Sequence, residues 1–176
     1  MADWAGEELF FPVLTGQSFV CCGCYMLRCE AFFAIYPRRQ IPEYDVGQNF
    51  QMLLPFLYRH RCPTIPEALY TVHVSPDSHS RRPLTEREEE KKYADFEDLV
   101  DELAALCPVE SPGERRRIAL WKMDRRYALA LRHNQRGRGA AALVWLLVHG
   151  GMEPGRAARE AAKLASRAAA LLVLTF

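Results

Sequence analysis

The second half of the chain carries two helix-start patterns, and these restrict the possible fold more than any other feature of the sequence. Thr85 and Glu88 match a capping box, in which each side chain satisfies the free backbone N–H of the other residue. Ser111 and Glu114 repeat the pattern, and Pro112 stands at the first helical position, where its missing N–H costs nothing. Behind both starts, apolar residues recur at helical spacing: Tyr93, Phe96, Val100, Leu103 and Leu106, then Ile118, Trp121, Tyr127 and Leu131.

Charge is unevenly distributed in this helical half. Residues 86–110 are strongly acidic, whereas residues 115–138 carry nine Lys or Arg against one Asp. A basic helix with interleaved Trp and Tyr can bind RNA, another phosphate-rich ligand or an anionic membrane surface. We favour the alternative that the acidic and basic helices pack as an antiparallel pair, because the two runs are consecutive and their connection is short. Gly-Arg-Gly at 137–139 predicts a break, and two further helices are expected around residues 150–155.

The first half of the chain contains two segments with strand character. Residues 17–28 are rich in Val, Phe, Cys and Tyr around a central Gly23, which predicts a buried strand or a strand pair bent at the glycine. Residues 64–74 predict a second strand with a proline near its start, where a missing N–H is tolerated.

Helical patterns lie between these two segments. Residues 29–36 predict a short helix, and residues 47–58 predict an amphipathic helix that Pro55 should bend or shorten. The expected fold class is α/β and predominantly helical. Two or three strands should lie in residues 1–83, and residues 84–176 should form a helical C-terminal region.

Composition excludes several classes of protein. The net charge of +1 gives no reason to expect a specific nucleic-acid partner, and the first eleven residues carry three acids and no Lys or Arg, unlike a secretory signal. The longest apolar runs, 140–148 and 168–176, are far shorter than the roughly 20 residues that span a bilayer. We therefore expect a soluble, cytoplasmic protein without a transmembrane segment, and a peripheral position at the inner membrane face is the alternative.

Six cysteines stand at positions 21, 22, 24, 29, 62 and 107. Four of them lie close together, but Cys21 and Cys22 are adjacent and no second tight pair exists, whereas structural zinc sites usually combine two spaced pairs. Disulfides are not expected without a secretory signal. The expected role is that of buried, reduced thiols that pack as small apolar residues.

Three segments in a fixed order carry a resemblance to a known family. They are GCYMLRCEAF at 23–32, Gly-Gln-Asn at 47–49 and PEALYTVHVSPDSHS at 66–80. Together they resemble the C-terminal, acceptor-side part of the GT-A type, family 2-like inverting glycosyltransferases. The N-terminal half of such a domain binds the nucleotide sugar and ends in an Asp-x-Asp, and we expect this chain to lack that half. The resemblance covers roughly residues 18–80.

The resemblance assigns catalytic positions to Gln48 and Asn49. In the family this position holds Gly-Glu-Asp, whose Asp is the general base for the acceptor hydroxyl. Neither Gln nor Asn is basic enough to accept that proton near neutral pH, although both can hold a hydroxyl by hydrogen bonding. Glu43 or Asp45 could replace the base, but loop carboxylates are usually just solvated.

The resemblance also implies substrate-binding and metal-binding residues. Gly23, Tyr70, Ser78 and Ser80 match positions that contact the substrate in the family. A divalent metal, Mg²⁺ or Mn²⁺, would be held in part by His73, which lies two residues before the position of the family's histidine and on the same face of the expected strand. The chain has no Asp-x-Asp to complete such a site.

Three hypotheses about function follow. In the first, the chain is the acceptor-side portion of a glycosyltransferase, which in complete relatives transfers a sugar from a nucleotide sugar to a hydroxyl of a glycan or lipid-linked acceptor. In the second, it is a non-catalytic glycan-binding or assembly module. In the third, it is a helical interaction protein that binds anionic partners through its Arg-rich helix. An uncovered sheet edge would also favour a homodimer.

Overall fold

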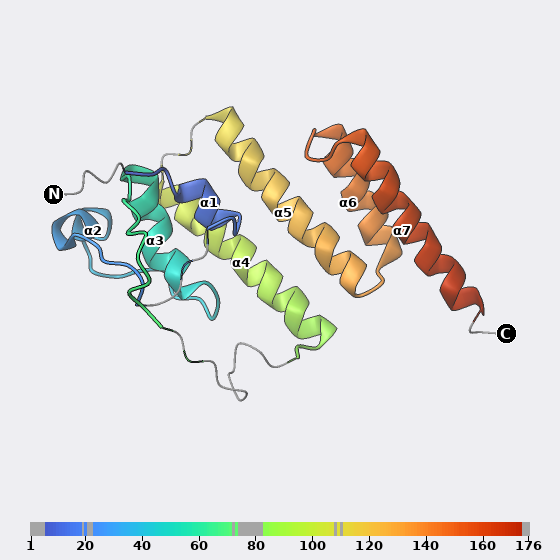
Figure 1. Cartoon of the computed structure of the whole chain (residues 1–176), viewed down its shortest axis with the longest axis horizontal. Helices are drawn as coiled ribbons and strands as arrows, with labels where there is room; N and C mark the ends of the chain where they lie inside the picture. The colour runs from blue at the N-terminus through green and yellow to red at the C-terminus, as the bar shows by residue number, and fades with distance from the viewer. Residues whose placement is uncertain are drawn as a thin grey trace. The chain divides into compact units, whose positions relative to one another are not determined.

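The computed structural model describes residues 6–18, 20, 23–71, 73, 83–107, 109 and 111–173, and their regular structure is α-helical (Figure 1). The helices in chain order are α1 (Phe10–Leu14), α2 (Cys29–Ile35), α3 (Gln48–Arg59), α4 (Glu86–Leu106), α5 (Pro112–Arg132), α6 (Arg136–Val148) and α7 (Pro154–Val173).

Two compact units divide the chain, and α4 contributes to both. Unit 1 consists of Met1–Leu84 and Ala94–Val109, and unit 2 of Thr85–Tyr93 and Glu110–Phe176. The first eight residues of α4 therefore belong to unit 2 and the remainder to unit 1. The domain boundary expected between residues 83 and 84 stays a prediction.

Unit 1 is built around α3. This helix packs against α1 and α2. It buries Leu53, Leu54 and Leu57, and α1 buries Phe10, Val13 and Leu14. The later turns of α4 close the unit, because the Phe50 and Phe96 rings meet edge to face at 5.8 Å and Arg59 donates to the carbonyl of Leu106 at 2.9 Å. The core residues are Phe10, Val13, Leu14, Leu53, Leu54, Leu57, Leu99, Val100 and Leu103.

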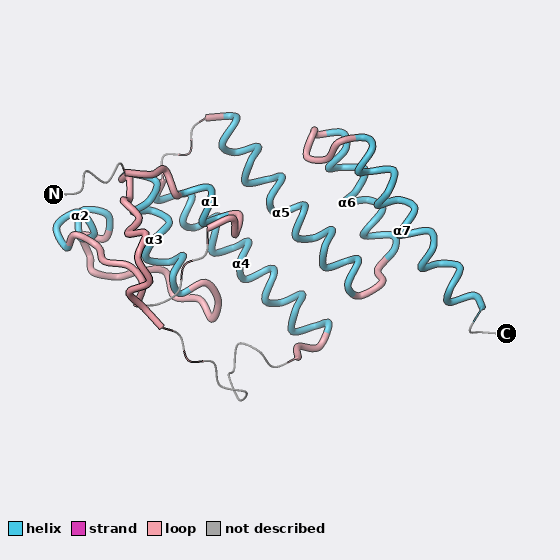
Figure 2. Tube along the Cα trace, in the orientation of Figure 1, coloured by secondary structure: helices cyan, strands magenta, loops and turns pink. Residues whose placement is uncertain are grey.

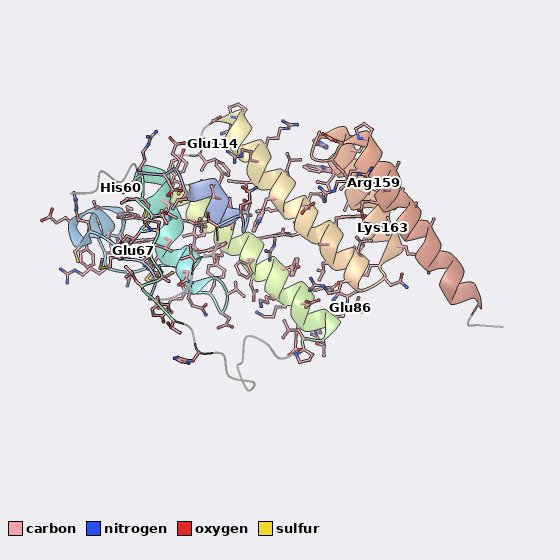
Figure 3. The ribbon with its side chains drawn as sticks, in the orientation of Figure 1. His60, Glu67, Glu86, Glu114, Arg159 and Lys163 are labelled. Carbon is pink, nitrogen blue, oxygen red and sulfur yellow. The ribbon has the colours of Figure 1, made fainter. Side chains whose placement is uncertain are left out.

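Unit 2 contains α5, α6 and α7, and α6 packs against both of the others. Its core consists of Tyr127, Ala142, Leu143, Leu146, Met152 and Ala157. The Tyr127 hydroxyl donates to Glu160 at 3.0 Å and so joins α5 to α7. Burial, followed by this hydrogen bond, raises the pKa of Tyr127 to about 12. The exposed Arg159 and Lys163 lie on α7 (Figure 3).

The helix starts follow the sequence patterns closely. The Thr85–Glu88 capping box is confirmed, since Thr85 N–H donates to Glu88 Oε2 at 2.8 Å and Glu88 N–H donates to Thr85 Oγ1 at 3.3 Å. Ser111 is the N-cap residue of α5, but its side chain makes no capping hydrogen bond, so the Ser111 side of the second box is not formed. Pro55 does not shorten α3, which continues to Arg59 with the proline buried.

The expected strands are wrong, and with them the α/β fold class. The described parts of residues 17–28 and 64–74 are coil, and the described residues form no strand or sheet (Figure 2). The β pairing found among the described residues is an isolated antiparallel bridge between Glu7 and Cys62. Strand composition produces a strand only where a neighbouring strand supplies ladder partners, and among the described residues none does. The sheet edge on which we based a homodimer is therefore also missing from this part of the chain.

Two further expectations need correction. The break expected at 137–139 lies earlier, at residues 133–135, and Gly139 is inside α6, where a Cβ would lie 3.1 Å from the Leu164 side chain of α7. Cys24 and Cys29 carry exposed thiols rather than buried ones, whereas Cys107 is buried. Cys21 and Cys22 lie outside the described residues. Within the described part of the chain, no helix is long and apolar enough to span a membrane.

Candidate functional site

The two predicted catalytic positions, Gln48 and Asn49, form the first turn of α3. The helix begins there because Gly47, its N-cap residue, adopts a left-handed conformation with φ of 61°. A Cβ at Gly47 would lie 2.8 Å from Leu99 and 3.0 Å from Phe96, so a glycine is needed for space as well as for conformation. Gln48 is exposed and Asn49 is half-buried.

The side-chain amide of Asn49 is held in one orientation by two partners. Its Nδ2 donates to the backbone carbonyl of Val20 at 3.2 Å, and its Oδ1 accepts from the Tyr25 hydroxyl at 3.2 Å. A carbonyl oxygen can only accept a hydrogen bond, so the NH₂ group must face Val20 and the oxygen must face Tyr25. The amide orientation therefore follows from the chemistry of the partners.

Gly23 and Tyr70, both predicted to contact substrate, lie against each other. Gly23 has φ of 89°, and a Cβ there would lie 2.9 Å from ring atoms of Tyr70. The Tyr70 side chain is nevertheless 52% exposed. The segment that carries Gly23 also carries Val20 and Tyr25, so it links the start of α3 to Tyr70. We call Val20, Gly23, Tyr25, Asn49 and Tyr70 the Asn49 cluster.

The loop that leads into α3 is fixed by a buried residue that the sequence patterns did not indicate. Gln51 donates from Nε2 to the carbonyls of Tyr44 at 2.9 Å and Val46 at 3.0 Å. Tyr36 donates to the Gln51 carbonyl at 2.5 Å, and burial raises the Tyr36 pKa to about 12. These bonds hold the Asn49 end of α3 in place.

The remaining predicted site residues do not join this cluster as a metal site. His73 is exposed, and Ser78, Ser80 and the neighbouring His79 lie outside the described residues. Among the residues that the structure describes, no group of three or more His, Cys, Asp or Glu is placed to hold a metal ion. The donors that are described do not fit the implied Mg²⁺ or Mn²⁺. Glu43 and Asp45, the alternative bases, are both exposed.

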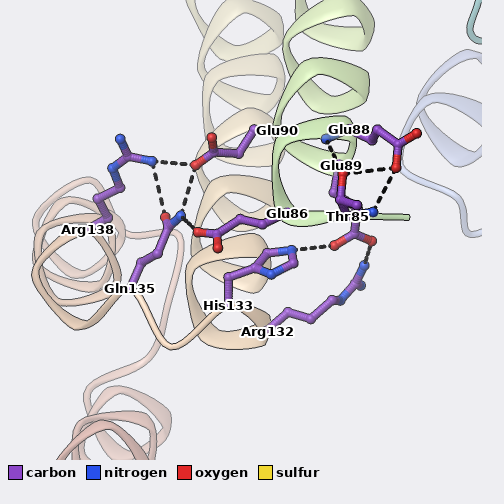
Figure 4. A network of polar contacts seen from close by, with 9 residues as sticks. All are labelled: Thr85, Glu86, Glu88, Glu89, Glu90, Arg132, His133, Gln135 and Arg138. Atoms are coloured by element: carbon purple, nitrogen blue, oxygen red, sulfur yellow. Dashed lines mark hydrogen bonds and ion pairs between the residues drawn. The ribbon is translucent and has the colours of Figure 1, made fainter. Parts of the chain in front are cut away.

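In unit 2, acidic residues in the first turns of α4 contact basic residues of α5, of the turn that follows it and of α6. Glu89 accepts from Arg132 and contacts His133 Nε2 at 2.6 Å, and Glu90 pairs with Arg138 at 2.6 Å (Figure 4). The Arg125 guanidinium lies 4.4 Å from the Tyr93 ring centroid, one helical turn further along α4. The contacts of Glu89 with Arg132 and of Tyr93 with Arg125 run in opposite directions along the two helices, as the favoured antiparallel arrangement predicts for the first turns of α4; packing of the rest of the acidic helix against the basic one stays a prediction.

This polar network changes the ionisation of its carboxylates. Burial raises the pKa of Glu89, but hydrogen bonds from His133 and Arg132 outweigh it and lower the pKa below its usual value. The hydrogen bond from Gln135, opposed by burial and helped by Arg138, lowers the pKa of Glu90. Arg116 donates twice to the carbonyl of His149, at 3.1 and 2.6 Å. Several arginines of the basic run therefore serve internal contacts.

Comparison of the chain with protein-family models, curated proteins and solved structures finds no match. No known protein therefore supports a function for the Asn49 cluster, and its chemistry follows from the contacts of its residues.

Proposed function

We propose that the chain binds a hydroxyl-rich ligand, a sugar or glycan acceptor, through the Asn49 cluster, as the acceptor-side part of a glycosyltransferase-like protein. The observation that carries this proposal is the fixed orientation of the Asn49 amide, beside a segment that packs on the half-exposed Tyr70 ring. Gly23 and Tyr70, which the sequence resemblance assigns to substrate contacts, and Asn49, which it assigns to a catalytic position, belong to this one cluster.

The chemistry of the cluster suits a sugar hydroxyl. An Asn side chain has two N–H donors and an oxygen with two lone pairs. Val20 uses one donor and Tyr25 uses one lone pair, so one of each is left over from the two bonds described. A hydroxyl both donates and accepts, and it can use these two groups together. The exposed face of Tyr70 offers an apolar surface of the kind that aromatic rings present to ligands.

The proposal assigns binding to these residues and no proton transfer. Neither Asn49 nor Gln48 is basic enough to deprotonate a hydroxyl near neutral pH. Sugar transfer from a nucleotide sugar, with its metal ion, is the activity of the glycosyltransferase family that the sequence resembles, and no step of it is assigned to the described residues.

A glycan array probed with the fluorescently labelled full-length chain tests the proposal. The glycans that bind are then titrated by calorimetry against the wild-type chain and its variants. Asn49→Ala and Tyr70→Ala should each weaken binding by about 1 kcal/mol or more, roughly fivefold or greater, because each removes a direct contact. Tyr70→Phe should keep binding, because it retains the ring.

The control is Tyr44→Phe, which removes a tyrosine hydroxyl that donates to Glu102 at 2.9 Å elsewhere in unit 1. It should bind as the wild type does. Equal glycan binding by wild type, Asn49→Ala and Tyr70→Ala, or no glycan bound at all, would reject the proposed function.

A further inference from the structure

The positive charge of the chain is concentrated in unit 2. The residues of unit 2 include sixteen Lys and Arg against nine Asp and Glu, a net charge of +7, whereas unit 1 has seven against thirteen, a net charge of −6. The overall net charge of +1 therefore conceals one strongly basic and one strongly acidic unit. Such asymmetry between two parts of a chain indicates that the basic part attracts an anionic partner.

The basic residues of α5 are engaged within the chain itself. All seven of them take part in an interaction with other residues of the protein, as Arg116 and Arg132 do with their acceptors in unit 2. The aromatic residues Trp121 and Tyr127 of the same helix are buried, so their rings are not available to stack on a nucleic-acid base. We therefore looked for the contact with an anionic partner on another element of unit 2.

Helix α7 carries a row of cationic positions. The row consists of Arg156, Arg159, Lys163 and Arg167, at spacings of three, four and four residues, which places them along one line of the helix. The first three are exposed, and Arg159 and Lys163 are labelled in Figure 3. Among the residues that the structure describes, no side-chain hydrogen bond or ion pair involves Arg156 or Arg159.

The acidic residue of α7 does not neutralise this row. Glu160 has a side chain that is only 13% exposed, and it accepts from Tyr127 at 3.0 Å and from Lys163 at 2.7 Å. The hydrogen bond from Lys163, opposed by burial and helped by the one from Tyr127, lowers the pKa of Glu160, and the charge of Arg156 adds to this effect. Glu160 thus offsets Lys163, and the charges of Arg156 and Arg159 stay available at the surface.

The remainder of α7 indicates which anionic partner this row fits. Ala158, Ala162 and Ala165 form a second exposed row, and no charged residue follows Arg167 before the helix ends at Val173. The helix contains no aromatic residue, Asn or Gln, the residue types that stack on bases or read their edges. A basic row beside an apolar one is typical of helices that lie on a membrane surface, and four cations on such a helix are typical of binding to anionic lipid.

We propose that α7 binds the surface of a bilayer that contains anionic lipid, through the guanidinium groups of Arg156 and Arg159, with Arg167 next in the same row. The row from 156 to 167 extends about 16 Å along the helix axis, so its cations meet the headgroups of neighbouring lipids. A guanidinium group forms paired hydrogen bonds to phosphate and carboxylate groups, which anionic headgroups supply. This contact makes no use of the Asn49 cluster and goes beyond the proposed glycan binding.

Co-sedimentation of the full-length chain with lipid vesicles tests this proposal. The wild type should bind vesicles of phosphatidylcholine mixed with phosphatidylserine and not vesicles of phosphatidylcholine alone. Binding should weaken as salt is added, because salt screens the attraction. Arg156→Gln and Arg159→Gln combined should lower the vesicle partition coefficient about 25-fold, roughly fivefold for each cation removed. Both side chains are exposed, so circular dichroism and thermal unfolding should be unchanged.

Two controls decide between the row on α7 and a general effect of charge. Arg87→Gln combined with Lys92→Gln removes the same charge from exposed positions of α4 in the same unit, and this variant should bind within about twofold of the wild type. Titration of a fluorescent RNA oligonucleotide at the same salt concentration compares lipid with another polyanion. Absence of binding to the phosphatidylserine vesicles, equal binding to neutral vesicles, an equal loss in the two double variants, or binding to RNA in place of lipid would overturn the proposal.

Discussion

At the scale of single residues, the environment of Asn49 selects an amide over a carboxylate. An aspartate at this position would place a second acceptor against the Val20 carbonyl, which now receives an N–H at 3.2 Å. The Val20 carbonyl opposes ionisation of that carboxyl, whereas the Tyr25 hydroxyl and the N-terminal end of α3 favour it. We expect the carbonyl to outweigh them, so the pKa of the introduced carboxyl in the folded Asn49→Asp variant should lie above the ordinary aspartate value near about 4. Position 49 is therefore shaped for hydrogen bonding rather than for proton abstraction.

Asn49→Asp should for this reason destabilise the chain in a pH-dependent manner. A folded-state pKa raised above the unfolded value leaves the variant close to wild type at low pH and weakens it as pH rises through the folded pKa. We expect a loss of about 1–3 kcal/mol at pH 7. Chemical unfolding measured from pH 4 to pH 8 checks this, with Asn49→Ala as the uncharged control. A pH-independent difference between the two variants would contradict it.

The residues of the Asn49 cluster were only partly predictable from the sequence. Gly23, Asn49 and Tyr70 emerged from motif positions, but Tyr25 and Val20 did not. Their bonds to Asn49 span 24 and 29 residues of chain, and no local pattern encodes a contact at that separation. The burial of Gln51 was not predictable either, because a polar residue in an amphipathic helix normally lies on the side of the helix that faces solvent.

At the scale of elements, the start of α4 depends on the carboxylate of Glu89. Its side chain is only 14% exposed and meets both Arg132 and His133. Because its pKa is lowered in the folded chain, its contribution to stability is present above the ordinary Glu pKa of about 4.3 and is lost as pH falls through the folded value.

Glu89→Gln should therefore lower the free energy of unfolding by about 1 kcal/mol at pH 7, and the difference from wild type should shrink below about pH 4. Urea unfolding of the wild type and of Glu89→Gln, at pH 7 and below about pH 4, measures this difference in the free energy of unfolding. Glu8→Gln is the control, since Glu8 pairs with Arg61 at 2.8 Å but both side chains are mostly exposed. If the stability difference between Glu89→Gln and the wild type stayed constant with pH, the substitution would act through side-chain geometry and not through the charge of Glu89, which would contradict the prediction.

Helices were easier to predict than strands because their signals are local. The Thr85–Glu88 box and the apolar spacing of α3 and α4 involve residues three or four apart, and the structure contains all of these elements. A strand depends on pairing partners elsewhere in the chain. The aromatic content of residues 23–28 and 64–71 is instead used in single contacts such as that of Tyr70 with Gly23.

At the scale of the whole molecule, α4 is the element shared by the two units. Ala94 is the first of its residues that belongs to unit 1, and its side chain is exposed. Ala94→Pro should cost about 3 kcal/mol or more, because proline removes one helical hydrogen bond and clashes with the preceding turn. Ala94→Gly should cost about 1 kcal/mol.

Hydrogen exchange resolved by peptide measures this effect in each unit separately. Since the helix supplies turns to both, Ala94→Pro should reduce protection in α3 of unit 1 and in α5 of unit 2, with Ala94→Gly giving the same pattern more weakly. Loss of protection confined to one unit would mean that the shared helix does not couple their stability.

The exposed thiols of Cys24 and Cys29 have a consequence for the rate of chemical modification. Cys24 directly precedes Tyr25 of the Asn49 cluster, whereas Cys107 is buried and burial, with Glu7, raises the pKa of the Cys62 thiol. Alkylating reagents attack accessible thiolates, so Cys24 and Cys29 should be modified ahead of Cys62 and Cys107. A ligand seated against Tyr25 and Tyr70 would shield the nearer thiol. The rate at which Cys24 is modified in the unlabelled wild-type chain would therefore report whether a ligand is bound.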